Sequence, residues 1–343
     1  MANGLVVLNA GGTIAMRPGP RGLEIDPDFL PRLQTELEQL GINPAYLDCF
    51  NLEPPIASTS ATPAHWLRLA EWIRARADLY RSFIILHGTD TLAYSAAALT
   101  LLLRGLGSKN ILITGAQHPL PDHEARANLL GALYLARRRY PRPRPLVFFG
   151  GQLLDGLQVR KMDSHGPLAF QTPTGDCCGR LEFSRRANGA PQVGAFQFLS
   201  PMACYPNDEK SPFVWGESLH FQPGAVALLY LTPDLAPSAY EPLLADESVR
   251  AVIVLSYGRG NLPADERLRA ALKAAAARGV LLYNLSQCWR GGTDASTYAL
   301  GGDHLGLRSS PLTPEALYVA LHCQLAGNGD VASAEAILSS PNP

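Results

Sequence analysis

The chain has no long apolar run and no leader-like N-terminus. None of its apolar stretches approaches the roughly 20 residues that a membrane-spanning helix needs, and its first residues carry no basic region. The apolar run at residues 5–9 ends in a glycine turn, which is typical of a first strand and not of a signal peptide. We therefore expect a cytoplasmic protein with no membrane partner.

An excess of charge of one sign is also missing. The 29 basic and 30 acidic residues give a formal net charge of −1 at pH 7, which argues against nucleic acid or an anionic membrane as a partner. Three arginines at residues 137–139 are an exception, but cations at a helix end complement its dipole. With 47% hydrophobic and 17% charged residues, the composition excludes extensive disorder.

Metal, redox and cofactor motifs are absent as well. The six cysteines fall at no metal-binding or redox spacing, and the eight histidines never occur as H-x-x-x-H. No phosphate-binding G-x-x-x-x-G-K-[ST] and no G-x-S-x-G elbow occurs. Gly258 and Gly260 begin a dinucleotide fingerprint, but Pro263 stands where its last glycine belongs. We therefore predict no metal and no cofactor.

What the chain does have is two apolar segments that each end in glycine and threonine. The first runs from Leu5 to Thr13 and the second from Phe83 to Thr91. Each is typical of a buried strand that breaks into a glycine turn, with a hydroxyl just beyond the strand's carboxyl end. Ligands bind at that edge of open α/β sheets, so the threonines suggest a site that attacks with a hydroxyl.

Short apolar runs alternate with helical patterns along the chain. We predict strands at residues 5–9, 83–87, 110–114, 145–149, 225–231, 250–256 and 280–285. We predict helices at residues 63–77, 90–105, 124–139, 263–278 and 313–326. This alternation indicates an α/β fold with parallel sheets and right-handed crossovers.

The alternation is interrupted between residues 170 and 222, where we predict a β-ribbon followed by a connection. We therefore expect two domains. The larger would be an N-terminal parallel-sheet α/β domain at residues 1–200 that holds the threonines. A linker at 201–221 would lead to a smaller C-terminal α/β domain at 222–343.

From the residues alone, threonine chemistry is one of two open interpretations. A threonine hydroxyl is a weak nucleophile until a base takes its proton, and Thr89–Asp90 places a hydroxyl and a carboxylate at one strand end. A desolvated lysine beside them could serve as the base. Gly-Thr-Asp before a helix is, however, most often an N-cap. For His87 we expect a packed, hydrogen-bonded side chain and no catalytic role.

Two short motifs, Ala-Gly-Gly-Thr-Ile-Ala at residues 10–15 and Leu-His-Gly-Thr-Asp-Thr at residues 86–91, carry a wider resemblance. Further segments match in the same order at residues 53–59, 62–66, 113–120, 159–161, 169–170, 256–261, 284–288 and 312–316. Together they resemble the bacterial-type L-asparaginases, and the cytoplasmic type I branch fits best. The resemblance implies the asparaginase-like fold of two α/β domains and no cofactor.

The resemblance also implies catalytic roles. Thr13 would be the nucleophile that attacks the side-chain amide carbon of the substrate and gives an acyl-enzyme and ammonia. Thr89, Asp90 and Lys161 would form a second cluster that activates a nucleophile or water and moves protons. Backbone N–H groups near the two threonines could stabilise the oxyanion.

The implied substrate is a small amino acid. Asp90 would hold its α-ammonium, and Ser58 and the backbone N–H of Thr59 would hold its α-carboxylate. The carbonyl of Ala116 would contact the leaving amide. Asn261 would reach the site of a neighbouring subunit, because family sites are completed across a dimer, so we expect a homodimer or homotetramer.

The chain departs from the family at three places. Leu23 stands where the family has a lid tyrosine that helps to activate the first threonine, and Glu24 or Tyr298 would have to replace it. Ser60–Ala61 replaces an aspartate–methionine pair, and the loop at residues 119–126 is shorter and lacks a serine–aspartate step. A general base contributes about 10²–10⁴-fold to a rate, so the missing tyrosine bears directly on turnover.

We therefore expect an amidohydrolase that converts L-asparagine to L-aspartate and ammonia. An alternative is a protein of this fold that binds an amino-acid-like ligand with weak or no turnover, or an amidase for a related amide. A third is an ammonia-supplying amidotransferase subunit, which is less favoured because no additional partner-binding domain is expected before residue 5.

Overall fold

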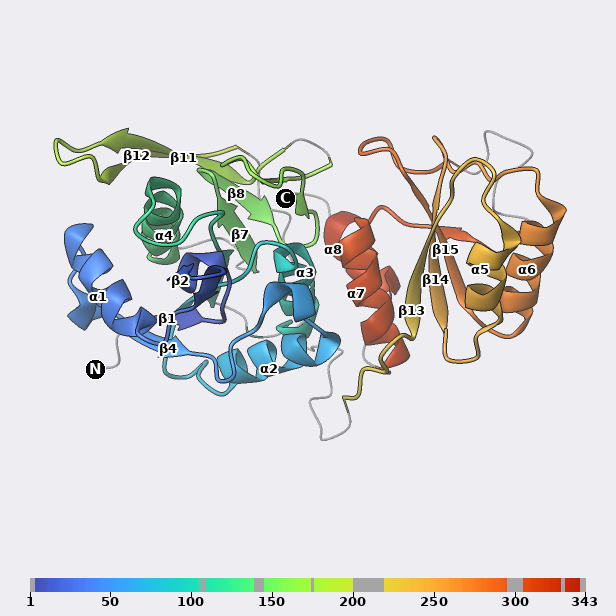
Figure 1. Cartoon of the computed structure of the whole chain (residues 1–343), viewed down its shortest axis with the longest axis horizontal. Helices are drawn as coiled ribbons and strands as arrows, with labels where there is room; N and C mark the ends of the chain where they lie inside the picture. Colours follow the sequence, from blue (N-terminus) through green and yellow to red (C-terminus); the bar gives the residue numbers. More distant parts are fainter. Residues whose placement is uncertain are drawn as a thin grey trace. The chain divides into compact units, whose positions relative to one another are not determined.

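The computed structural model of the protein describes residues 4–104, 106, 109–138, 145–173, 176–199, 219–294, 305–327 and 331–339. The chain divides into two compact units, each of which is described by itself (Figure 1). The first comprises Met1–Phe213 together with Ser339–Pro343, and the second comprises Val214–Leu338.

The first unit is built on an eight-stranded sheet in the order β12-β11-β8-β7-β6-β5-β1-β4. Its strands are β1 (Leu5–Asn9), β4 (Asp48–Asn51), β5 (Ser82–Leu86), β6 (Asn110–Thr114), β7 (Leu146–Phe149), β8 (Gln152–Asp155), β11 (Gly179–Arg185) and β12 (Pro191–Phe198). The strands from β4 to β7 are parallel, as the sequence predicts for this half of the sheet.

The sheet is nevertheless mixed and not wholly parallel, because β8, β11 and β12 join it antiparallel. The change of direction follows from a two-residue turn. Gly150 and Gly151, which join β7 to β8, have φ angles of 57° and 77°. A tight two-residue hairpin turn needs positive φ at both of its central residues, because only then does its twist match that of the two strands. The two glycines meet this requirement, so β8 runs back antiparallel to β7.

Among the described residues of the first unit, the sheet is covered by the helices α1 (Phe29–Gln39), α2 (Pro63–Arg74), α3 (Leu92–Leu102) and α4 (His123–Ala136). Buried residues of α1 and α4 pack with Val7, Ile84 and Leu112 on one face, and α2 and α3 lie on the other (Figure 1). The predicted helices at 63–77, 90–105 and 124–139 are confirmed within a few residues of their ends. Thr62 and Pro63 open α2 as N-cap and first residue.

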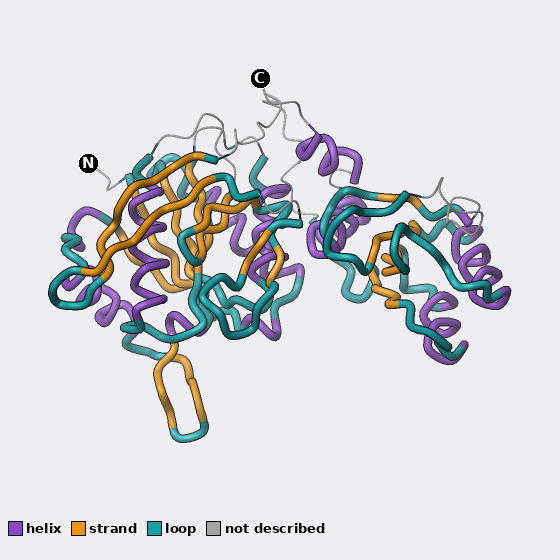
Figure 2. The backbone as a smooth tube through the Cα atoms, turned by 90° about the horizontal axis from the view of Figure 1, so that it is seen from above, coloured by secondary structure: helices purple, strands orange, loops and turns teal. Residues whose placement is uncertain are grey.

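Two small hairpins complete this unit. The strands β2 (Met16–Gly19) and β3 (Gly22–Ile25) form an exposed hairpin that projects from the unit (Figure 2). The strands β9 (Arg160–Lys161) and β10 (Phe170–Gln171) pair antiparallel. The predicted β-ribbon is confirmed by β11 and β12, while residues 200–218 lie outside the described part of the chain.

The second unit has a parallel sheet of β13 (Val226–Tyr230), β14 (Ala251–Ser256), β15 (Leu281–Ser286) and β16 (Arg308–Ser309). Its helices are α5 (Pro237–Ala245), α6 (Glu266–Ala277), α7 (Pro314–Leu325) and α8 (Val331–Ser339). Buried residues of α5 and α6 pack together with Val252 and Val254 of β14. Among the described residues, no helix has both the length and the apolar character to cross a membrane.

Candidate active site

The two glycine–threonine turns meet in the first unit. Asn9 at the end of β1 pairs with Leu86 at the end of the neighbouring parallel strand β5, so both turns leave the sheet at its carboxyl edge. A Cβ placed on Gly12 would lie 2.4 Å from the Cα of Gly88. The two turns therefore touch backbone to backbone, which only glycine permits at both positions.

Thr13 begins the short 3-10 turn Thr13–Ala15 that follows Gly12. The turn before it is fixed by Asn9, whose Oδ1 accepts a hydrogen bond from the N–H of Gly11 at 3.0 Å. The Thr13 side chain is half-buried. Among the residues that the structure describes, none makes a hydrogen bond to its hydroxyl, so this threonine is oriented through its backbone.

Thr89 lies in a complete hydroxyl–carboxylate–amine cluster. The Nζ of Lys161 donates to the Oγ1 of Thr89 at 2.8 Å and forms an ion pair with the Oδ1 of Asp90, also at 2.8 Å. The Lys161 side chain is 21% exposed and the Asp90 side chain 54%, so the carboxylate faces outward while the Thr89 hydroxyl lies buried. The arrangement can hold an external cation at Asp90 and pass a proton between Thr89 and Lys161.

The loop after β6 provides a further partner for this cluster. The Oγ1 of Thr89 donates to the Oε1 of Gln117 at 3.4 Å, and the Nε2 of Gln117 donates to the carbonyl of Asp163 at 3.3 Å. Gln117 is not among the site residues predicted from the sequence, since a single polar residue after a strand is usually a solvated loop residue. Gln117 does, however, follow Gly115 and Ala116 within the family-like segment at residues 113–120, and this position is the one indication of a role that the sequence offers.

Glu124 in the first turn of α4 holds this loop in place. Its two carboxylate oxygens accept from the N–H of Gln117 at 2.9 and 3.2 Å, and Oε1 also accepts from the Nδ2 of Asn128 at 3.1 Å. Burial raises the pKa of the Glu124 carboxyl, and hydrogen bonds from the backbone N–H groups of Gln117 and His118 lower it in part. The loop is thus clamped to α4 by a half-buried acid.

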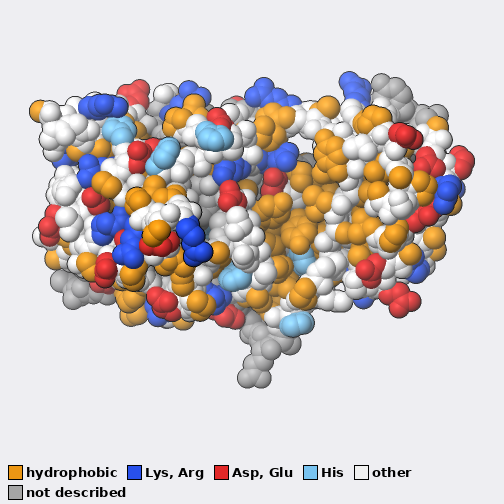
Figure 3. Space-filling view, viewed as in Figure 1, with side chains coloured by type: hydrophobic (Ala, Val, Ile, Leu, Met, Phe, Trp, Pro, Cys, Tyr) orange, Lys and Arg blue, Asp and Glu red, His pale blue; other side chains and the backbone are white. Residues whose placement is uncertain are grey.

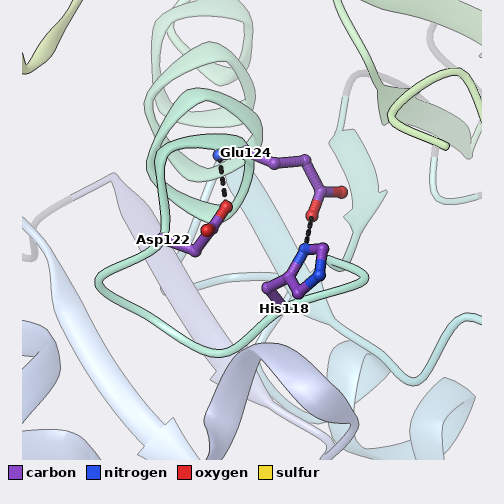
Figure 4. Close-up of side chains that lie close together, drawn as sticks. All are labelled: His118, Asp122 and Glu124. Carbon is purple, nitrogen blue, oxygen red and sulfur yellow. Dashed lines mark hydrogen bonds and ion pairs between the residues drawn. The ribbon is translucent and has the colours of Figure 1, made fainter. Parts of the chain in front are cut away.

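His118 and Asp122 lie beside Glu124 (Figure 4). The Nδ1 of His118 is 3.7 Å from the Oε2 of Glu124, and the potential ligand atoms of the three residues lie within 4.8 Å of one another. Asp122 is the N-cap of α4 and accepts from the N–H of Glu124 at 2.8 Å. Because both carboxylates already accept hydrogen bonds, we interpret the group as the support of the loop and not as a cation site.

Ser58 lies against the second glycine turn. A Cβ on Gly88 would be 2.3 Å from the Cβ of Ser58. The Ser58 hydroxyl lies 3.0 Å from the carbonyl of Gly88, from the Oγ1 of Thr91 and from the N–H of Thr91. Its hydroxyl therefore joins the turn to the start of α3. Thr59 follows in the same 3-10 turn, Ser58–Ser60, with an exposed side chain.

The remaining predicted residues lie in different places. Ala116 is fully buried beside Gln117, and a Cβ on the preceding Gly115 would lie 3.5 Å from the Cγ2 of Thr89. Asn261 belongs to the second unit, where it bridges to Tyr257. The structure brings together Thr89, Asp90 and Lys161 by direct contacts, and joins Thr13, Ser58 and Ala116 to them through adjoining turns.

Leu23 lies on the β2–β3 hairpin, with its side chain 47% exposed. Glu24, the local candidate to replace the family tyrosine, forms an ion pair with Arg17 across the same hairpin at 3.5 Å. Tyr298, the other candidate, lies outside the described residues. The described part of the chain therefore offers no hydroxyl or carboxylate within hydrogen-bond reach of Thr13.

His87 is packed and hydrogen-bonded, as the sequence predicts. It is buried, with its Nδ1 2.8 Å from the carbonyl of Gly88 and its Nε2 2.9 Å from the Oγ of Ser95. Burial lowers the pKa of His87. A neutral ring that donates from Nδ1 and accepts at Nε2 satisfies both contacts, so His87 supports the glycine turn.

A hydroxyl–carboxylate–amine cluster beside the carboxyl ends of parallel strands is an arrangement that can support nucleophilic catalysis. Two family models match the chain: "Asparaginase, N-terminal" over residues 4–189 and "Glutaminase/Asparaginase C-terminal domain" over residues 225–338. The chain belongs to the asparaginase family of amidohydrolases.

Individual relatives agree with this family. L-asparaginase 1 of Escherichia coli (strain K12) is 30% identical over 332 residues, which cover 93% of this chain and 90% of that protein. The structure of L-asparaginase I from Vibrio cholerae superposes with a TM-score of 0.72 at 26% identity, covering 98% of this chain and 97% of that one. The 60 kDa lysophospholipase of Homo sapiens is 31% identical over 285 residues, which cover 82% of this chain and 45% of that protein.

Proposed function

We propose that the protein hydrolyses the side-chain amide of L-asparagine to L-aspartate and ammonia. The observation that carries this proposal is the bonded cluster of Thr89, Asp90 and Lys161, with both side-chain contacts of the Lys161 Nζ at 2.8 Å. The cluster adjoins the turn of Thr13, so two hydroxyls and a proton carrier share one edge of the sheet. The family relationship to proteins named L-asparaginase supports the same reaction.

In the first half of the reaction, the Oγ of Thr13 bonds to the amide carbon of the substrate. The Thr13 proton is transferred to the leaving nitrogen, with Thr89 and Lys161 as the nearby groups that move protons in the site, and the C–N bond breaks so that ammonia departs. An ester between Thr13 and the aspartyl group remains as the acyl-enzyme. In the second half, water attacks the ester carbon, and its proton returns to the Oγ of Thr13 as aspartate leaves.

Substrate binding follows from the charges around the cluster. Asp90 holds the α-ammonium, since its carboxylate is exposed beside Lys161. Ser58 and the backbone N–H of Thr59 hold the α-carboxylate, and the carbonyl of Ala116 contacts the leaving amide. Asn261 completes the site of a neighbouring subunit in a homodimer or homotetramer. The proposed location of the enzyme is the cytoplasm.

A second candidate is a protein that binds an amino-acid-like ligand with weak or no turnover. It is favoured by Thr13, whose hydroxyl has no hydrogen-bond partner among the described residues, and by the exposed Leu23 in place of the lid tyrosine. A nucleophile that no base activates reacts slowly. The two candidates differ in what happens to the bound amino acid.

Ammonia release from L-asparagine, D-asparagine, L-glutamine and small peptides separates the candidates. We expect the fastest release from L-asparagine, and a loss of about 10²-fold or more in Thr13→Ala, because the attacking oxygen is removed. Calorimetry on the same samples measures binding. Binding of L-asparagine without ammonia would favour the second candidate, and release unaffected by Thr13→Ala would rule out Thr13 as the nucleophile.

A further inference from the structure

Gln117 contacts Thr89 directly and also contacts the segment that follows Lys161. Its Oε1 accepts from the hydroxyl of Thr89 at 3.4 Å, and its Nε2 donates to the carbonyl of Asp163, two residues after Lys161, at 3.3 Å. One amide side chain thus spans from the strand end that carries Thr89 to the hairpin segment that carries Lys161. These two segments are 72 residues apart in the chain.

The Thr89 hydroxyl has a defined direction in this arrangement. It accepts a hydrogen from Lys161 at 2.8 Å and donates its own to Gln117. A hydroxyl has one hydrogen to give and lone pairs to receive, so a fixed acceptor on one side leaves a lone pair facing the ammonium on the other. Without Gln117 the hydroxyl of Thr89 can rotate about its Cβ–Oγ1 bond, and its lone pair is no longer held toward the Nζ of Lys161.

Gln117 is itself held by α4. Glu124 accepts from the N–H of Gln117, and Asn128, one turn further along α4, donates to Glu124 and to the carbonyl of Gly115 at 3.0 Å. Asn128 in turn accepts from the N–H of Gly150 at 3.0 Å. The backbone on both sides of Ala116 is therefore anchored, which limits where the Gln117 side chain can reach.

We propose that Gln117 is a positioning residue that orients the hydroxyl of Thr89 toward Lys161, with its own backbone fixed by Glu124. The role rests on the proposed amide hydrolysis. It acts through Thr89 and needs no contact between Gln117 and the substrate. Removing the Gln117 amide should therefore slow the chemical step and leave substrate binding nearly unchanged.

The test compares Gln117→Met with Gln34→Met, which makes the same chemical change on the exposed face of α1. We expect Gln117→Met to lower kcat for L-asparagine about 10- to 100-fold with KM within about threefold, since small misplacements of reacting groups have effects of this size. Gln34→Met should match the parent. If Gln117→Met fails to fold, Gln117→Asn, which is too short to reach both partners, is expected to lower kcat in the same way.

A kcat within twofold of the parent in a folded Gln117 variant would overturn the proposal, and so would a loss that appears only in KM. A crystal structure of the variant gives a readout that does not depend on activity. We expect the Thr89 Oγ1–Lys161 Nζ contact of 2.8 Å to be lost or split between rotamers. If the parent releases no ammonia, the proposed function fails on its own, and an unchanged contact in the variant would then refute the positioning role separately.

Discussion

The hydroxyl of Ser58, for which we propose a role in binding the substrate carboxylate, also has structural contacts. It contacts the carbonyl of Gly88 and both the N–H and the hydroxyl of Thr91, each at 3.0 Å. Thr91 is the N-cap of α3 and makes no capping bond with its own side chain, so Ser58 supplies the acceptor at the start of that helix. A substrate carboxylate at Ser58 would have to share this hydroxyl with α3.

Replacement of Ser58 by alanine is therefore expected to affect stability as well as binding. The change leaves the N–H of Thr91 without its acceptor, which should lower the free energy of unfolding by about 1–2 kcal/mol. It should also raise KM for L-asparagine. Urea denaturation and steady-state kinetics measure the two effects, with Ser60→Ala, an exposed serine in the same turn, as the control. An unchanged stability would show that Ser58 does not cap α3.

Part of the candidate site can be predicted residue by residue. Thr89 and Asp90 follow an apolar strand directly, so their place at the edge of the sheet follows from the local pattern. Lys161 lies on a two-residue strand far along the chain, and only the family resemblance indicates it. The roles of Gln117 and Glu124 could not be predicted, because they depend on contacts with residues that are not their neighbours in the chain and the local sequence carries no pattern for such contacts.

At the scale of elements, the site depends on the close approach of two turns. Gly12 has a φ of 93°, and a Cβ there would lie 2.4 Å from both the Cα and the N of Gly88. These are backbone atoms of the buried turn after β5, so they cannot move aside as a flexible side chain can. The contact fixes the spacing between the strand ends that carry Thr13 and Thr89.

Gly12→Ala is thus expected to destabilise the first unit and to abolish activity. The matched control is Gly189→Ala, where φ is 80° and a Cβ meets nothing within 4 Å. In the control the free energy of unfolding should fall by only about 1–2 kcal/mol, the cost of placing alanine in the left-handed region. Thermal melting compares the two variants. Equal losses of stability in Gly12→Ala and Gly189→Ala would show that the turns at Gly12 and Gly88 are not in close backbone contact.

The central strands that the sequence predicts share one property. The central strands β1, β5, β6 and β14 are continuous apolar runs, and burial on both faces gives them a sequence signal that needs no context. The missed elements lack it. The edge strand β4 reads Asp-Cys-Phe-Asn, and α5 contains Pro242 in its interior, which normally breaks a helix.

At the scale of the whole molecule, the surface and the composition both show a balance of positive and negative charge. Basic and acidic side chains are interspersed on the face in Figure 3, as expected for a chain whose 29 basic and 30 acidic residues nearly balance. The long-range field is therefore weak, and the proposed amino-acid substrate, which bears both charges, would be attracted only by local groups such as Asp90 and Lys161. Recognition is thus expected to depend weakly on salt.

The second unit contains a buried histidine that ties its stability to pH. His322 on α7 is 2% exposed and makes an edge-to-face contact with Tyr318, with ring centroids 4.7 Å apart. Burial lowers the pKa of His322 to about 4 from its ordinary 6.5. Because the folded state holds the ring neutral, the stabilising contribution is fully present above pH 6.5 and is lost as the pH falls toward 4.

We therefore expect the unfolding free energy of the protein to fall between pH 6.5 and 4 more steeply than that of His322→Phe. The difference should reach on the order of 3 kcal/mol, since each unit of pKa shift corresponds to about 1.4 kcal/mol. Denaturation at a series of pH values measures it, with the exposed His220→Gln as the control. Parallel pH profiles for the parent and His322→Phe would contradict this expectation.

We propose that the cluster of Thr89, Asp90 and Lys161 drives amide hydrolysis at the meeting point of the two turns. The most direct test is the rate of ammonia release from saturating L-asparagine by the parent and by Thr89→Val, which keeps the shape and removes the hydroxyl bonded to Lys161. We predict release by the parent and a rate at least about 10²-fold lower in the variant. Equal rates in the two proteins, or no ammonia from the parent, would contradict this role of the cluster.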